Sequence, residues 1–244
     1  MEMSSKHKIV LLLTASINPK DAPEVAIPDS KEREEQYLNA LKYYSLIDYP
    51  IVFIDSSNTI SNSITNIGKG IESFEYHAFS SINSYLGKGH GEKEILDYAF
   101  QKSELLANAK HVVKINGRYC INNIDKIIEK VKLSNADIRV NFGLNLSRCD
   151  SRLIIFKPDF YIHYFKPTLE KYLDEPSKMF FENVLSRSVH LLMAEGGIYE
   201  PWPMYPYYKG INGANGNKVD FKFVKRLRYT LFYRLKIWFL RQMV

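Results

Sequence analysis

The fold of this chain is constrained most by a strand, a helix and a second strand that follow one another near the start of the sequence. Residues 8–14 form a nearly continuous apolar run, which is typical of a central strand in a parallel sheet. Residues 31–46 repeat apolar side chains at helical spacing, and residues 49–55 form a second buried-type strand. Since such units cross over in the right-handed sense, the sequence predicts an α/β fold with a mostly parallel sheet flanked by helices.

Polar side chains stand where the first two predicted strands end. Thr14 and Ser16 follow the first strand, and Asp55 ends the second. Ligands of open α/β sheets bind at this edge, so we expect Thr14 and Ser16 to line a binding site and Asp55 to contact a ribose or a base. The alternative for Asp55 is a helix cap or a turn in which its carboxylate binds nearby backbone.

A glycine-rich segment follows the predicted third strand, residues 74–79. Its sequence, Gly87-Lys-Gly-His-Gly-Glu92, runs directly into a predicted helix over residues 93–109. Glycines and a lysine ahead of a helix can hold phosphate on backbone N–H groups and the helix N-terminus, which makes Lys88 a candidate ligand. The spacing is not that of a P-loop, and a simple hinge is the alternative.

The stretch from His111 to Asn123 predicts a fourth strand, a turn and a new helix. The turn again falls at the edge where α/β sheets bind ligands. An ordinary turn, with Arg118 paired to a surface carboxylate, is the alternative. The residues that we expect to line a site here are Asn116, Gly117, Arg118 and Tyr119.

The second half of the chain predicts further strands at residues 137–142 and 153–165, the latter interrupted by Pro158. Residues 177–193 repeat apolar side chains at helical spacing, with Glu182 near the start of that helix. A glutamate there suits the helix dipole, but it can also project into a cleft as a base. The Pro-, Tyr- and Gly-rich residues 200–216 have no regular period and are typical of a loop that carries binding residues.

The last segment, residues 221–241, has a different pattern. At 100° per residue, Leu227, Leu231 and Trp238 share one face, while most of the basic side chains lie opposite. Residues 218–244 hold eight basic residues and one acid, whereas the whole chain has a net charge of +6. This is the pattern of a basic amphipathic helix that lies in an anionic membrane surface. Docking on its own domain or on a second subunit is the alternative.

The charge pattern also bears on domains and partners. Residues 1–217 are predicted to form the sheet domain, and residues 218–244 a membrane-interface tail. Nucleic acid is not an expected partner, because the basic residues of the tail are interleaved with an apolar face and the rest of the chain supplies no basic patch. The oligomeric state is left open.

Several classes of protein are disfavoured by missing patterns. The two cysteines show no pairing pattern, and zinc spacings, a nucleophile elbow and a dinucleotide fingerprint are absent from the sequence. The first eight residues are polar, and the apolar run that follows is too short for a signal peptide or a spanning helix. The chain is therefore expected in the cytoplasm.

Taken in order, these motifs resemble a known family. The Asp-ended second strand, Gly-Lys-Gly-x-Gly-Glu before a helix, and Lys-Ile-x-Gly-Arg-Tyr after the next strand are similar to the bacterial glycosyltransferases that build lipopolysaccharide O-antigens and capsules. The resemblance extends from the first strand through residues 211–213. It implies a GT-A-like, Rossmann-type fold, a nucleotide-sugar donor and a lipid-linked oligosaccharide acceptor at the inner face of the cytoplasmic membrane.

One departure from that family changes the expected chemistry. Typical GT-A enzymes carry Asp-x-Asp, which holds a metal on the donor diphosphate, where this chain has Asn116-Gly-Arg118. No metal ligand and no required cofactor are therefore assigned, and dependence on a divalent metal is left open. Arg118, assisted by Lys114 or Lys88, is predicted to stabilise the leaving phosphates.

The resemblance also implies a base on a helix after the sheet. Glu182 is the predicted general base, with Asp150 in reserve, and direct displacement with inversion follows from that assignment. The competing hypothesis is a non-catalytic, membrane-associated binding or scaffold protein with a degenerate glycosyltransferase fold.

Overall fold

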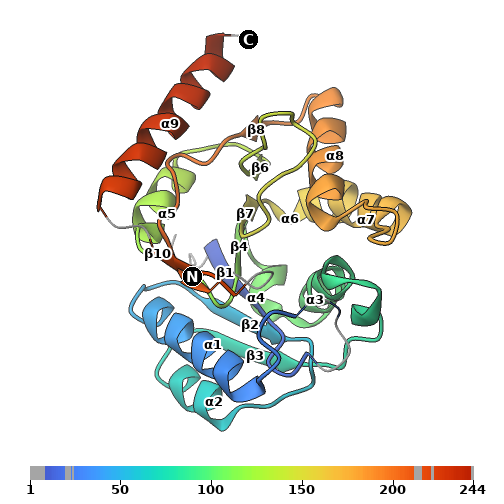
Figure 1. Cartoon of the computed structure of the whole chain (residues 1–244), viewed down its shortest axis with the longest axis vertical. Helices are drawn as coiled ribbons and strands as arrows, with labels where there is room; N and C mark the ends of the chain where they lie inside the picture. Colours follow the sequence, from blue (N-terminus) through green and yellow to red (C-terminus); the bar gives the residue numbers. More distant parts are fainter. Residues whose placement is uncertain (1–8, 20–22, 24, 212–215, 221–222, 243–244) are drawn as a thin grey trace.

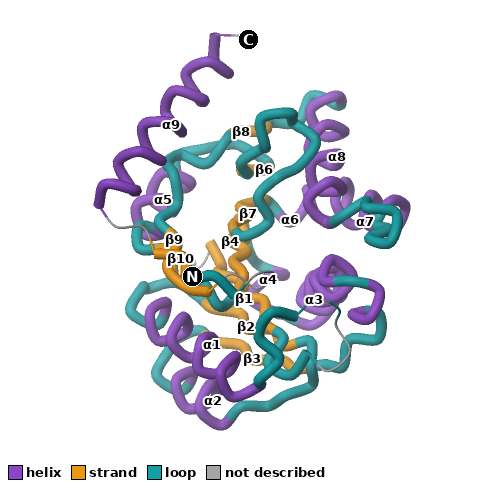
Figure 2. Tube along the Cα trace, in the orientation of Figure 1, coloured by secondary structure: helices purple, strands orange, loops and turns teal. Residues whose placement is uncertain are grey.

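The computed structural model of the 244-residue chain describes residues 9–19, 23, 25–211, 216–220 and 223–242. A seven-stranded sheet in the order β3-β2-β1-β4-β7-β6-β8 lies at its centre, with helices around it (Figures 1 and 2). Strand β7 runs antiparallel to both of its neighbours, and the other neighbouring pairs are parallel. The strands of this sheet are β1 (Ile9–Ala15), β2 (Ile51–Asp55), β3 (Phe74–Ala78), β4 (His111–Asn116), β6 (Ile138–Arg139), β7 (Leu153–Phe156) and β8 (Tyr199–Glu200).

The first strand, helix and strand form as predicted. Helix α1 (Ser30–Tyr44) begins at Asp29, whose side chain accepts the N–H of Glu32 and so caps the helix. Strand β1 is buried along its whole length and pairs with β2 on one side and β4 on the other. A strand buried on both faces reads as a continuous apolar run. The predicted α/β class, with a mostly parallel sheet flanked by helices, is confirmed.

Alternate residues of β1 face two separate cores. Leu11 and Leu13 pack in a cluster with α1, with α2 (Asn62–Gly68) and with α5 (Ile124–Lys132). Val10 and Leu12 pack in the other cluster, with α3 (Lys88–Lys102) and α8 (Phe181–Ala194). The two-residue period of a strand therefore places a helical layer on each face of the sheet.

Two stretches adopt a different structure from the predicted one. Strand β7 ends at Phe156, and Pro158 is the first residue of helix α6 (Pro158–Phe160) rather than a bend in a long strand. Proline suits that position because its φ angle is already helical and the first N–H of a helix needs no partner. The helical path continues through the π-helical turn η3 (Tyr161–Phe165) and helix α7 (Lys166–Tyr172).

The glycine-rich segment is also helical, since α3 begins at Lys88 directly after the 3-10 turn η2 (Ser84–Leu86). The predicted helix therefore starts earlier than expected. It ends at Lys102 and is followed by the short helix α4 (Glu104–Ala107).

A smaller sheet carries the chain towards its C-terminal helix. Its strands are β5 (Cys120–Ile121), β9 (Tyr208–Ile211) and β10 (Lys218–Asp220), in the order β10-β9-β5. The predicted domain boundary between residues 217 and 218 falls inside the β9–β10 hairpin.

Helix α9 (Phe223–Gln242) projects from the body of the molecule (Figure 1). Its inner face docks on the sheet domain, where Tyr233 is 5% exposed within the core cluster of β1. Its outer face exposes Leu231 and Trp238, at 59% and 55%. Among the described residues, no helix is both long enough and apolar enough to cross a bilayer.

The basic side chains of α9 do not all follow the predicted pattern. Arg226 lies over the ring of Tyr207, and Lys236 donates to the side chain of Asn141. Both residues therefore face the protein. Docking on its own domain accounts for this inner face, whereas the exposed apolar face points outward. Phe221 and Lys222, at the start of the predicted amphipathic segment, lie outside the described residues.

Candidate active site

A cavity of about 560 Å³ opens at the carboxyl ends of β1 and β4, bordered by the starts of α3 and α8. Most of the predicted site residues line it: Thr14, Ser16, Lys88, Asn116, Gly117, Arg118, Tyr119 and Glu182. Residues that the sequence did not assign to the site line it as well, among them Arg33, Tyr37, Ser84, Glu92, Ser151, Arg152, Glu175 and Phe181.

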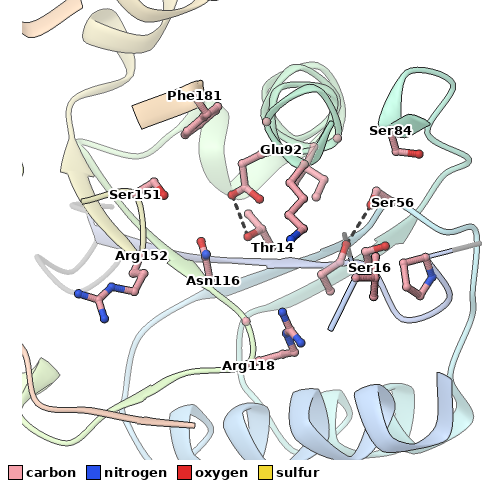
Figure 3. Close-up of a pocket in the computed structure, with 18 of the residues that line it drawn as sticks. Thr14, Ser16, Ser56, Ser84, Glu92, Asn116, Arg118, Ser151, Arg152 and Phe181 are labelled. Atoms are coloured by element: carbon pink, nitrogen blue, oxygen red, sulfur yellow. Dashed lines mark hydrogen bonds between the residues drawn. The ribbon is translucent and has the colours of Figure 1, made fainter. Parts of the chain in front are cut away.

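The turn after β4 aims Arg118 into this cavity (Figure 3). The N–H of Gly117 donates to the carbonyl of Thr14 at 2.8 Å, and a Cβ atom at position 117 would lie only 2.8 Å from the same oxygen. Glycine is therefore needed for the close approach of the two strand ends. Arg118 Nη1 is buried and has no hydrogen-bond partner among the described residues.

Arg33 of α1 lies beside Arg118 on the same wall. It is 5% exposed, and its Nε donates to the carbonyl of Ser16 at 2.7 Å. Burial lowers the pKa of Arg33, and the charge of Arg118 acts in the same direction. An anion between the two guanidinium groups would relieve this repulsion. In the sequence Arg33 is one charge among several at the start of a helix, so no local pattern marks it.

Lys114, one of the predicted ligands, is not among the residues that line the cavity. Its side chain is fully buried, and its ammonium group forms an ion pair with Glu92 of α3. The same Nζ donates to Asn116 Oδ1 at 2.5 Å and to the carbonyl of Ser151 at 3.0 Å. Three acceptors satisfy the three N–H donors of an ammonium group. Lys114 therefore links α3 to the end of β4 and to the segment that precedes β7, and its ammonium group is directed at the protein.

Asp55, which is predicted to contact a ribose or a base, is also hydrogen-bonded within the protein. Its carboxylate is fully buried and accepts from the N–H of Ile17 at 2.7 Å, and from the N–H of Ser57 at 2.9 Å. Burial raises the pKa of Asp55, while these hydrogen bonds act in the opposite direction. The turn alternative accounts for this acid. Asp55 shapes the loop after β1 and is not among the residues that line the cavity.

The N-terminus of α3, where the sequence predicts that phosphate binds, is in contact with a carboxylate of the protein itself. Glu175 accepts the N–H of Gly89 at 2.9 Å. At Gly87, where φ is 148°, a Cβ atom would lie 1.7 Å from the carboxylate of Glu175. A carboxylate at a helix N-terminus has the place that an anionic ligand would take. The side chain of Lys88 remains on the wall of the cavity.

Glu182 reaches the cavity from the first turn of α8. Its Oε1 accepts the hydroxyl proton of Ser151 at 2.7 Å. Burial raises the pKa of Glu175, and the nearby charge of Glu182 adds to that shift. The two carboxylates are therefore neighbours, and Glu182 is the one that a serine hydroxyl orients.

Asp150, the reserve base, is already engaged. Its carboxylate accepts from Nε of Arg152 at 2.9 Å and from Nη2 at 2.5 Å. The guanidinium of Arg152 also lies over the ring of Tyr208, 4.2 Å from the ring centroid. Both oxygens of this carboxylate are thus occupied by the guanidinium group, which leaves less room for an acceptor hydroxyl. The geometry therefore favours Glu182 over Asp150.

The remaining predicted residues have structural partners too. Thr14 donates its hydroxyl to Glu92 at 3.0 Å (Figure 3), and the N–H of Ser16 donates to the hydroxyl of Tyr37. Tyr119 is 4% exposed and packs edge-on against Tyr208. Within the described part of the chain, no group of three His, Cys, Asp or Glu side chains is arranged to hold a metal ion.

No family model matches the chain, and no curated protein matches its sequence. Solved structures do match its fold. Core-mannan synthase A from Aspergillus fumigatus, solved with Mn and GDP, is 11% identical, with a TM-score of 0.48 over 84% of this chain and 77% of that one. The inositol-1-phosphate CTP transferase from T. maritima is 10% identical, with a TM-score of 0.47 over 88% and 93%.

The galactosyltransferase LgtC, solved with donor and acceptor sugar analogs, is 7% identical, with a TM-score of 0.48 over 74% of this chain and 70% of that one. Likenesses of this strength do not assign an activity to the chain.

Proposed function

We propose that this protein is a glycosyltransferase that moves a sugar from a nucleotide-sugar donor to the hydroxyl group of an acceptor. The observation that carries the proposal is the buried Nη1 of Arg118, which has no hydrogen-bond partner among the described residues and lies beside Arg33. Both arginines line the cavity that also receives Glu182. A cationic wall and a carboxylate in one cavity suit the departure of a diphosphate and the deprotonation of an alcohol.

In this proposal the arginines stabilise the leaving group. As the bond between the anomeric carbon and the diphosphate oxygen breaks, negative charge develops on the phosphates. The planar fork of Arg118 can donate to two phosphate oxygens at once, and Arg33 adds a second positive charge. Because the chain has Asn116-Gly-Arg118 in place of an acidic pair, we propose that transfer does not depend on a divalent metal.

The acceptor hydroxyl supplies the electrons for the new bond and loses its proton to Glu182. Ser151 holds Oε1 of that carboxylate, and we assign Oε2 to the acceptor proton. One displacement by the acceptor, without a covalent enzyme intermediate, inverts the configuration at the anomeric carbon.

We further propose a lipid-linked oligosaccharide of bacterial surface polysaccharide synthesis as the acceptor, used at the inner face of the cytoplasmic membrane. The outer face of α9 supports this, because exposed Leu227, Leu231 and Trp238 are accompanied by exposed Arg228 and Arg234. Each basic residue near an anionic leaflet contributes roughly 1 kcal/mol. The apolar side chains would be buried among the lipid headgroups.

A donor screen tests the proposal. Purified protein is melted with each of a set of nucleotide sugars, with and without EDTA, since a ligand that binds only the folded state raises the melting temperature. We expect at least one donor to stabilise the protein in EDTA. Stabilisation by none of the donors would favour the binding and scaffold hypothesis. A strict requirement for a divalent metal would contradict the role given to Arg118.

A further inference from the structure

The inner face of α9 approaches Arg152, a residue that lines the cavity, through two aromatic rings. Tyr229 of α9 stacks on Tyr205, with ring centroids 5.4 Å apart and an interplanar angle of 28°. Tyr205 in turn lies close enough to Arg152 for its charge to act on the Tyr205 hydroxyl: burial raises the pKa of Tyr205, and the guanidinium of Arg152 opposes that shift. The helix therefore packs against a residue that neighbours Arg152.

A second contact connects α9 to Asp150, the ion-pair partner of Arg152. Lys236 of α9 donates to Asn141 Oδ1 at 2.8 Å and also to the carbonyl of Phe142. The carbonyl of Asn141 accepts the N–H of Asp150 at 2.9 Å. One helix is thus connected to both members of the Asp150–Arg152 ion pair, to Asp150 through the hydrogen bonds of Asn141 and to Arg152 through the ring of Tyr205.

Ser151, which lies between Asp150 and Arg152 in the sequence, orients the candidate base Glu182. Ser151 donates its hydroxyl to Glu182 at 2.7 Å, and its carbonyl accepts from Lys114. Rotation of the 150–152 turn would therefore move the hydrogen bond that fixes Glu182. Misplacement of a catalytic group by about 1 Å can cost on the order of 10²-fold in rate.

We infer that α9 is a remote part of the active site, in which Tyr229 and Lys236 are positioning residues for Glu182 that act through the 150–152 turn. The catalytic part of this inference rests on the proposed function, because it takes Glu182 as the base. Leu227, Leu231 and Trp238, which are exposed at 62%, 59% and 55%, lie on the opposite side of the same helix at 100° per residue. The surface proposed to meet the membrane and the residues that hold the turn are therefore two faces of one element.

Hydrogen exchange tests the structural part without any substrate. The full-length protein is compared with Tyr229→Ala and Lys236→Met, and the exchange of amides in residues 149–153 is followed by mass spectrometry. We expect these amides to exchange about 10-fold faster in both variants, while β1 exchanges as in the wild type. The outer-face variants Arg228→Ala and Arg234→Ala are matched controls and should match the wild type. Unchanged exchange at 149–153 in both inner-face variants would overturn the inference.

Kinetics tests the catalytic part. In Tyr229→Ala and Lys236→Met we expect kcat to fall by about 10- to 100-fold, with the KM for the donor changed by less than about threefold, because Arg118 and Arg33 are not held by this turn. Tyr229→Phe keeps the stacked ring and should restore kcat. Equal losses in kcat and in donor affinity would indicate a general loss of structure and overturn the positioning role.

The two proposals fail in different ways. If the wild type transfers no sugar from any donor, the proposed function fails, and hydrogen exchange still decides whether α9 holds the turn. If the wild type is active and the inner-face variants keep its kcat, the proposed function stands and the inference is wrong.

Discussion

The buried ammonium group of Lys114 forms an ion pair with the carboxylate of Glu92, joining strand β4 to helix α3 behind the candidate active site. The lysine side chain is 0% exposed, and that of Glu92 is 20% exposed. Thr14 donates to the same carboxylate. A pair with this burial is costly to break, because loss of one partner leaves an uncompensated charge.

Lys114→Met should therefore destabilise the fold by about 3–5 kcal/mol. The double variant Lys114→Met/Glu92→Gln should recover part of that loss, because it removes both charges. Urea denaturation of the two single variants and the double variant gives the coupling energy. Additive losses would show that the two side chains do not interact.

Arg118→Ala should lower kcat/KM for the donor by about 10²- to 10³-fold, as expected when one donor to a developing negative charge is lost. Arg118→Lys should recover only part of the activity, because an ammonium group cannot form the two parallel hydrogen bonds of a guanidinium. Arg187→Ala, which removes an exposed arginine outside the cavity, is the matched control. Equal activity of Arg118→Ala and this control would exclude Arg118 from the site.

Glu182→Gln should lower kcat by about 10²- to 10⁴-fold, because the amide keeps the shape of the side chain but cannot take a proton. Glu170→Gln removes an exposed carboxylate on α7 and should be neutral. NMR of the product of the wild type should show inversion at the anomeric carbon. A retained configuration would contradict the direct displacement assigned to Glu182.

The buried side chain of His111 is expected to make the stability of the fold depend on pH. The side chain is 3% exposed, and burial, reinforced by nearby positive charges, lowers its pKa to about 4. An unfolded histidine has a pKa of about 6.5, so above that pH both states are neutral and the group has no effect. Between about 6.5 and 4 only the unfolded state binds the proton, and stability falls as the pH is lowered.

At pH 5 this contribution should reach about 2 kcal/mol relative to pH 7.5. His111→Phe should lose that part of the pH dependence, whereas His163→Phe, at an exposed position, should keep it. Chemical denaturation at the two pH values measures the difference. An identical pH dependence in the wild type and His111→Phe would show that His111 titrates normally in the folded protein.

The outer face of α9 should bind vesicles that contain anionic lipid. Reversing the charges of Arg228 and Arg234 to glutamate should weaken binding by at least about 2 kcal/mol, or roughly 30-fold, at low salt. Leu231→Glu should weaken it through the apolar face, whereas Leu133→Glu changes a leucine that is even more exposed, on another surface, and should not. Co-sedimentation with vesicles gives the affinities. Binding that survives both outer-face changes would assign the membrane contact elsewhere.

The class of fold and the edge of the sheet that carries the site are predictable from local sequence. The apolar run of β1, with Thr14 and Ser16 at its end, already identifies a strand buried on both faces and a polar opening at its carboxyl end. Gly117 and Arg118 follow β4 in the same way. These features depend on the period of a strand and on a sharp turn, and residues close together in the sequence determine both.

The partners of the charged side chains are not predictable from local sequence. The sequence presents Lys114, Asp55 and the start of α3 as three ligand positions, yet the structure turns each towards the protein: Lys114 to Glu92, Asp55 to Ile17, and the α3 N-terminus to Glu175. No local sequence pattern indicates that Arg33 lines the cavity or that Lys236 contacts Asn141. The sequence alone determined the layers and the edge where chemistry is possible, because these follow from short-range periodicity. Only the tertiary structure decided which charges are neutralised and which face the cavity, because a charge pairs with whatever side chain the fold brings beside it.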